Sequence, residues 1–69
     1  MMRVLVNGET QHLRDDATLA SIVESLHGRS DGRGVAAALD GEVVPRASWE
    51  KTCLSEGARI EIVVAVQGG

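Results

Sequence analysis

Apolar residues dominate one short run near each end of the chain. Residues 3–7 read Arg-Val-Leu-Val-Asn, and residues 60–66 read Ile-Glu-Ile-Val-Val-Ala-Val. β-Branched residues favour a pleated, buried surface, so both runs are predicted to be strands in the middle of a sheet. Alternate side chains of a strand point to opposite faces. The side chains predicted to point inward are Val4, Val6, Ile60, Ile62 and Val64. Leu39, from a further strand that is predicted at residues 35–39, joins them.

Two dipeptides predict β-hairpins. Asn7-Gly8 and Asp40-Gly41 suit type I′ turns, because both central residues of such a turn need a positive φ. The turns place further strands at residues 9–13, 35–39 and 42–44. Pro45 should end the last of these, since proline lacks a backbone N–H for the ladder.

One amphipathic helix is predicted between the hairpins. Thr18 is a suitable N-cap, and Gly28 can supply the left-handed residue after His27. A second, short helical turn over residues 46–52 should place Trp49 inward, and a turn is expected at Gly57. The apolar stripe of the main helix recurs at helical spacing and should pack on the inward face of the sheet; it comprises Leu19, Ile22, Val23 and Leu26.

The order of these elements predicts an α+β fold with two layers. The first and last strands can lie parallel and adjacent if the helix provides a right-handed crossover. The result is a β-grasp arrangement: a mixed sheet of four to five strands with one main helix on one face. Residues 1–66 are expected to form this domain, and residues 67–69 a flexible tail with no apolar anchor.

Composition excludes several classes of function. The formal charge of −3 on 69 residues argues against a nucleic-acid partner, which usually meets a basic stripe. The single Cys53 cannot form an internal disulfide. No apolar run approaches the roughly 20 residues that span a bilayer, and the first residues lack a signal-peptide pattern. We therefore expect a cytoplasmic protein with no membrane partner.

The sequence contains no recognisable catalytic constellation. His12 and His27 lie in different predicted elements, and no Cys/His spacing resembles a zinc site. Cys53, beside Leu54, is more typical of a small buried residue than of a nucleophile. The adjacent Asp15 and Asp16 are expected to be solvated before the helix, and Trp49 to be a core residue. We expect neither an enzyme nor a bound metal or cofactor.

The last three residues are the candidate functional group. Gln67-Gly68-Gly69 directly follows the predicted central strand and can reach roughly 10 Å beyond it. Glycines without side chains could enter a narrow active site. The α-carboxylate of Gly69 is a poor electrophile when ionised, so it would need activation, most simply as an acyl-adenylate made from ATP by a partner. The alternative is an ordinary frayed end.

Three stretches resemble the ThiS family, the ubiquitin-like sulfur carriers of thiamine biosynthesis. They are residues 4–8, residues 38–46 with Trp49, and residues 60–69. Asp40 stands where the family often has Asn, and Ala58 where an acidic residue is usual. The resemblance implies that a ThiF-like adenylyltransferase uses ATP and Mg to adenylate Gly69. A sulfur-donating enzyme would then give a thiocarboxylate, and a ThiG-like thiazole synthase would receive the sulfur for the thiazole ring.

Two alternatives remain at this stage. The chain could be a MoaD-like small subunit of molybdopterin synthase, or another ubiquitin-like sulfur carrier or modifier. Its shortness and the stretch from Pro45 to Trp49 favour the thiamine carrier. In either case, partners could bind beside the tail. The candidates are Leu5, Val63 and Ala65 of the sheet face opposite the helix, together with Val66.

Overall fold

The computed structural model describes residues 1–27 and 34–64. Its elements follow the predicted order, with boundaries that differ from the prediction by at most two residues over the described part of the chain. They are β1 (Met2–Val6), β2 (Glu9–Leu13), α1 (Leu19–His27), β3 (Val35–Leu39), β4 (Glu42–Val44), the 3-10 helix η1 (Arg46–Lys51) and β5 (Arg59–Val64).

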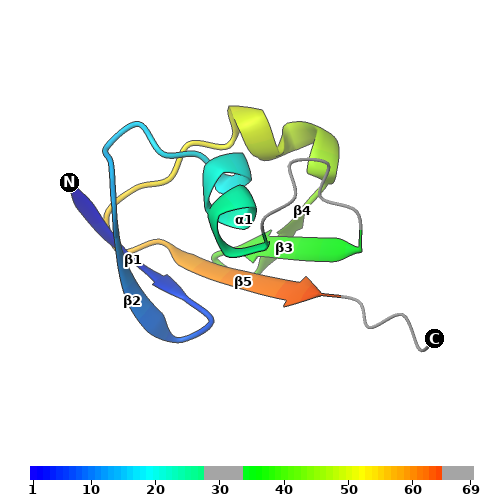
Figure 1. Cartoon of the computed structure of the whole chain (residues 1–69), viewed down its shortest axis with the longest axis horizontal. Coiled ribbons are helices and arrows are strands. Elements are labelled where there is room, and N and C mark those ends of the chain that lie inside the picture. Colours follow the sequence, from blue (N-terminus) through cyan, green and yellow to red (C-terminus); the bar gives the residue numbers. More distant parts are fainter. Residues whose placement is uncertain (28–33, 65–69) are drawn as a thin grey trace.

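The strands form one mixed sheet in the order β2-β1-β5-β3-β4 (Figure 1). The central strand β5 runs parallel to β1 and antiparallel to β3. The helix α1 crosses one face, and η1 follows β4 on the same side (Figure 1). This is the predicted α+β, ubiquitin-like β-grasp fold. Neither α1 nor η1 has the length and the continuous apolar surface of a membrane-spanning helix.

Both predicted hairpin turns are confirmed. Asn7 and Gly8 have φ angles of 51° and 85°, and Asp40 and Gly41 have φ angles of 50° and 87°. These positive values are those that a type I′ turn requires. The turns set the antiparallel registers in which Val6 faces Glu9 and Leu39 faces Glu42.

The core lies between α1, η1 and the inward face of the sheet. Trp49 is buried there, and its indole Nε1 donates a 2.8 Å hydrogen bond to the carbonyl oxygen of Val44. This contact confirms the interpretation of Trp49 as a core residue. The buried apolar residues are Met2, Val4, Val6, Leu19, Ile22, Val23, Ala37, Trp49, Leu54, Ala58 and Ile60.

Two residues predicted to be inward lie at the margin of this core instead. Leu26 is 49% exposed and Val64 is 48% exposed, so the packing of the helix stripe ends one turn early. The register explains Val64: the last pair between β1 and β5 is Val6 with Ile60, whereas Val64 pairs only with Val35 of β3. The end of β5 therefore has a neighbouring strand on one side only, which leaves Val64 at the margin of the core.

The prediction for Cys53 was also wrong, because its thiol is exposed. Cys53 forms an isolated antiparallel bridge with Thr18, and the next residue, Leu54, turns into the core. Neighbouring residues in an extended segment point to opposite sides. The burial of Leu54 therefore sends the thiol of Cys53 outward.

Candidate functional site

The predicted reactive residues lie outside the part of the chain that the structure describes. These are Gln67, Gly68 and Gly69, together with the partner-binding candidates Ala65 and Val66. The site is therefore built on β5, which ends at Val64, five positions before Gly69.

The strand that precedes these residues is held from both sides. Its β3 neighbour pairs with it along five positions, from Leu39 opposite Ile60 to Val35 opposite Val64. On the other side, β1 pairs with Arg59 and Ile60. Backbone hydrogen bonds on both sides restrict the strand. Because β5 lies between β1 and β3, the prediction that this run forms a strand in the middle of the sheet is confirmed.

The face of the sheet away from α1 carries four neighbouring apolar residues, and the charged Glu61 of β5 lies on the same face, opposite Ala38. Val63 is 64% exposed on this face and lies opposite Ala36 of β3. On the other side of β3, Val43 of β4 is 74% exposed and lies opposite Ala38. Directly opposed side chains in neighbouring antiparallel strands lie within contact distance. We call Ala36, Ala38, Val43 and Val63 the open-face patch.

Leu5 shares the open face but not the patch. It is 38% exposed and pairs with Arg59 on one side and Thr10 on the other. Val63 lies four residues beyond Arg59, which is about 13 Å at the rise of a strand. The two partner-binding candidates Leu5 and Val63, which adjacent first and last strands were expected to bring together, are therefore separated by the register of β1 and β5. Val43 was missed, although the Asp40-Gly41 turn already implies its position opposite Ala38.

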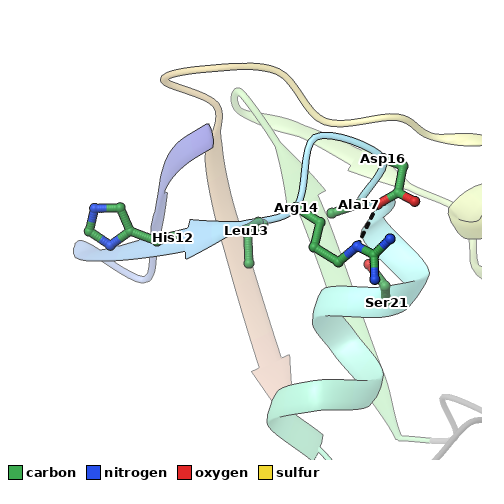
Figure 2. A pocket seen from close by; sticks show the side chains of 6 residues that line it. All are labelled: His12, Leu13, Arg14, Asp16, Ala17 and Ser21. Atoms are coloured by element: carbon green, nitrogen blue, oxygen red, sulfur yellow. Dashed lines mark ion pairs between the residues drawn. The ribbon is translucent and has the colours of Figure 1, made fainter. Parts of the chain in front are cut away.

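A shallow hollow lies elsewhere, between β2 and the start of α1 (Figure 2). Its volume is about 540 Å³, and its wall contains charged side chains from the connection between the two elements. Arg14 Nε lies 3.3 Å from Asp16 Oδ1 within it. The hollow is lined by His12, Leu13, Arg14, Asp16, Ala17 and Ser21.

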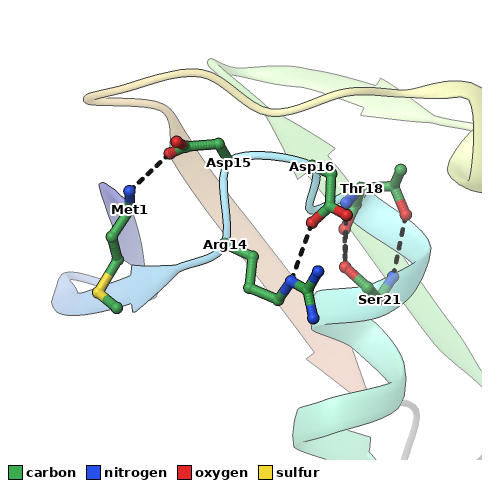
Figure 3. Close-up of polar contacts among 6 residues, drawn as sticks. All are labelled: Met1, Arg14, Asp15, Asp16, Thr18 and Ser21. Atoms are coloured by element: carbon green, nitrogen blue, oxygen red, sulfur yellow. Dashed lines mark hydrogen bonds and ion pairs between the residues drawn. The ribbon is translucent and has the colours of Figure 1, made fainter.

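The acidic pair beside this hollow is engaged in exposed ion pairs. The N-terminal amine lies 2.9 Å from Asp15 Oδ1, and Asp16 pairs with Arg14 (Figure 3). Both carboxylates are largely solvated, as the sequence predicted, and such exposed pairs contribute at most about 1 kcal/mol. This arrangement is that of a surface connection and supplies no paired acid and base.

The same region contains the predicted helix cap. The backbone N–H of Ser21 donates to Thr18 Oγ1 over 3.3 Å, which confirms Thr18 as the N-cap (Figure 3). In return, the Ser21 hydroxyl accepts the N–H of Thr18 over 3.0 Å and donates to its carbonyl over 2.7 Å. Reciprocal bonds of this kind satisfy backbone donors at the start of a helix. Thr18 and Ser21 therefore have a structural role.

Within residues 1–27 and 34–64, no group of three or more His, Cys, Asp and Glu side chains is arranged to hold a metal ion. His12 is exposed on the edge strand β2, as predicted. The described surface thus offers the open-face patch, beside a central strand, as its main candidate for a functional contact.

Comparison with known proteins identifies a family and similar proteins. A model described as the ThiS family matches residues 4–69. A thiazole synthase from Paramagnetospirillum magneticum is 29% identical over 68 residues, which cover 99% of this chain and 20% of that protein. The chain thus spans about a fifth of the length of this curated relative.

Structural comparison identifies a thiamine biosynthesis protein, ThiS, from Geobacter metallireducens. Its crystal structure has 23% sequence identity and a TM-score of 0.78, and the match covers 99% of this chain and 100% of that one. A solution structure of a thiamine biosynthesis protein from the same organism gives 23% identity and a TM-score of 0.79, covering 99% of this chain and 88% of that one. At this level of identity the likeness supports the shared fold.

Proposed function

Because the chain belongs to the ThiS family, we propose that it is a sulfur carrier for formation of the thiazole ring of thiamine. The observation that carries this proposal is the extent of the family match, which runs from residue 4 to residue 69. It includes the central strand β5 and also Gly68 and Gly69. In this role the chain is a carrier and co-substrate, and partner enzymes perform the catalysis.

The proposed reaction begins at the carboxylate of Gly69. One of its oxygens attacks the α-phosphorus of ATP, the bond to pyrophosphate breaks, and an acyl-adenylate forms. Hydrosulfide supplied by a donor enzyme then attacks the acyl carbon; the new carbon–sulfur bond forms as the bond to AMP breaks, which leaves a thiocarboxylate. A ThiF-like adenylyltransferase binds the ATP and Mg, so this chain needs only to present an accessible C-terminus and a surface for recognition.

A thiazole synthase is the proposed acceptor of the sulfur. The thiazole synthase of Paramagnetospirillum magneticum contains a region similar to almost all of this chain. A carrier-like region within such a protein supports a functional partnership between the two activities. For this chain, we propose that a ThiG-like enzyme receives the sulfur.

The open-face patch is the proposed docking surface for the adenylyltransferase. Val63 belongs both to this patch and to β5, so a partner that grips the patch also holds the strand leading to Gly69. Exposed apolar side chains gain free energy when a partner removes them from water. Ala65 and Val66 are proposed to extend this surface, whereas Leu5 is proposed to lie outside it, because it pairs with Arg59, four residues from Val63.

Deletion of Gly69 tests the proposed function. The purified chain is incubated with the adenylyltransferase, the sulfur donor and ATP, and its intact mass is measured. We expect the parent chain to gain the mass that corresponds to replacement of one oxygen by sulfur, and the truncated chain to gain nothing while keeping its circular dichroism spectrum. A truncated chain that is still converted to a thiocarboxylate would contradict the assignment.

Cys53→Ser is the matched control for this experiment. Besides the carboxylate of Gly69, the exposed thiol of Cys53 is a group that could acquire sulfur. A persulfide at this position would add a sulfur atom without loss of oxygen, so the two products differ in mass. We expect the Cys53→Ser variant to form the thiocarboxylate as the parent chain does.

A further inference from the structure

The two type I′ turns contact the central strand β5 from opposite sides. In the first turn, the backbone N–H of Asn7 donates to the carbonyl of Ile60 over 2.9 Å. In the second turn, the backbone N–H of Asp40 donates to the carbonyl of Arg59 over 2.7 Å. Each turn then adds a contact from its side chain, and these side-chain contacts differ.

The carboxamide of Asn7 takes the place of a backbone peptide group beside β5, at the point where β1 has ended. Its Oδ1 accepts the backbone N–H of Ile62 over 2.9 Å, and its Nδ2 donates to the carbonyl of Ile62 over 3.2 Å. A carboxamide has both a donor and an acceptor, as a backbone peptide does. The side chain of Asn7 therefore continues the β1–β5 ladder for two residues after the backbone of β1 has turned away.

Asp40 performs only half of this task. Its Oδ1 accepts the backbone N–H of Arg59 over 2.9 Å, while the carbonyl of Arg59 is bound by the Asp40 backbone. An acceptor is sufficient here, so an ionised carboxylate fits. At Asn7 a carboxylate would place an acceptor against the carbonyl of Ile62. The chemistry of the contacts thus explains Asp at one turn and requires Asn at the other.

The two contacts also differ in their position along β5. Arg59 is the first residue of the strand, whereas Ile62 lies two residues before its end at Val64. The contact of Asn7 with Ile62, made from the β1 side, therefore lies closer to the C-terminal residues than the contact of Asp40 with Arg59. Its own φ of 51° restricts the choice further, because Gly, Asn and Asp accept this conformation more readily than most residues.

We propose that Asn7 is a positioning residue for the transfer reaction, an inference that rests on the proposed carrier function. By holding both backbone groups of Ile62, it attaches the last part of β5 on the side opposite its pairs with β3, and so restricts the direction in which the strand leads toward the activating enzyme. Without it, a smaller fraction of docked molecules would present Gly69 correctly, and the reaction would slow in proportion to that fraction.

Asn7→Gly and Asp40→Gly form a matched pair that tests this role. Glycine tolerates the positive φ at both positions, so each variant removes a side-chain contact and keeps the turn. Amide hydrogen exchange should become about tenfold faster at Ile62 in Asn7→Gly and at Arg59 in Asp40→Gly, which corresponds to about 1.4 kcal/mol. Thiocarboxylate formation should show a kcat/KM about threefold or more lower in Asn7→Gly only.

A purely structural role predicts a different result. If both variants slow the reaction equally, or if Asn7→Gly speeds exchange at Ile62 without changing kcat/KM, the positioning role is overturned. Should Asn7→Gly fold poorly, Asn7→Asp keeps the acceptor for the Ile62 N–H and removes the donor, and a kcat/KM equal to that of the parent chain would likewise overturn it.

The outcome for the parent chain separates the two proposals. A parent chain that is never converted to the thiocarboxylate would overturn the carrier function itself, and the positioning role with it. A parent chain that is converted, beside an Asn7→Gly variant converted at the same rate, would overturn the positioning role alone.

Discussion

Similar apolar residues lie on both faces of the sheet, but their exposure to solvent differs. Along β5, Ile60 is 1% exposed on the face under α1, whereas Val63 is 64% exposed on the other. Both are β-branched residues suited to a strand, so their local preferences are alike. The difference comes from α1 and η1, which cover one face only. Apolar character alone therefore does not show whether a residue belongs to the core or to an exposed face. The elements that cover the sheet decide this.

The largest expected effect is on the covered face. Ile60→Ala removes a fully buried side chain from the centre of the sheet and should lower the free energy of unfolding by about 2–5 kcal/mol. Val63→Ala, three positions away on the open face, should change it by roughly 0.5 kcal/mol or less. Urea denaturation followed by circular dichroism measures both values. Equal losses in the two variants would show that the open face is also buried, for example by self-association.

A smaller effect, on binding, is expected at the open face. Val63→Asp introduces a charge into the open-face patch and should weaken association with the adenylyltransferase by about tenfold, or roughly 1.4 kcal/mol, without unfolding the domain. Leu5→Asp is the control, because Leu5 lies on the same face about 13 Å from Val63 at strand spacing. Titration calorimetry compares the two. Equal weakening would extend the docking surface across β1, and unchanged binding in both would place docking elsewhere.

The smallest effect is expected at the margin of the covered face. Leu26 is half exposed in the last turn of α1, so Leu26→Ala should cost no more than about 1 kcal/mol, because the side chain loses little buried surface. Ile22→Ala, one turn earlier and fully buried, should cost about 2–5 kcal/mol. The same urea experiment gives both values, and a loss of several kcal/mol at Leu26 would mean that residues outside the described range cover it.

Local patterns in the sequence determined most of the architecture. Asn7-Gly8 and Asp40-Gly41 fixed two turns, because few other dipeptides accept two positive φ angles. The Val/Ile-rich run from Ile60 identified the central strand, and Thr18 identified the start of α1. The two turns and the run from Ile60 also carried the resemblance to the ThiS family, which the family match confirms. The candidate reactive residue, Gly69, was chosen from the sequence alone.

Only the tertiary structure decided which predicted faces are covered and which residues meet across strands. Leu26 and Val64 have the right periodicity for the core, yet they lie at the margin of the packed elements. Leu5 and Val63 share a face, yet the parallel register of β1 and β5 separates them. The carboxamide of Asn7 reaches Ile62, 55 positions away in sequence. Periodicity reports the side of an element on which a residue lies, whereas coverage and register depend on elements distant in sequence.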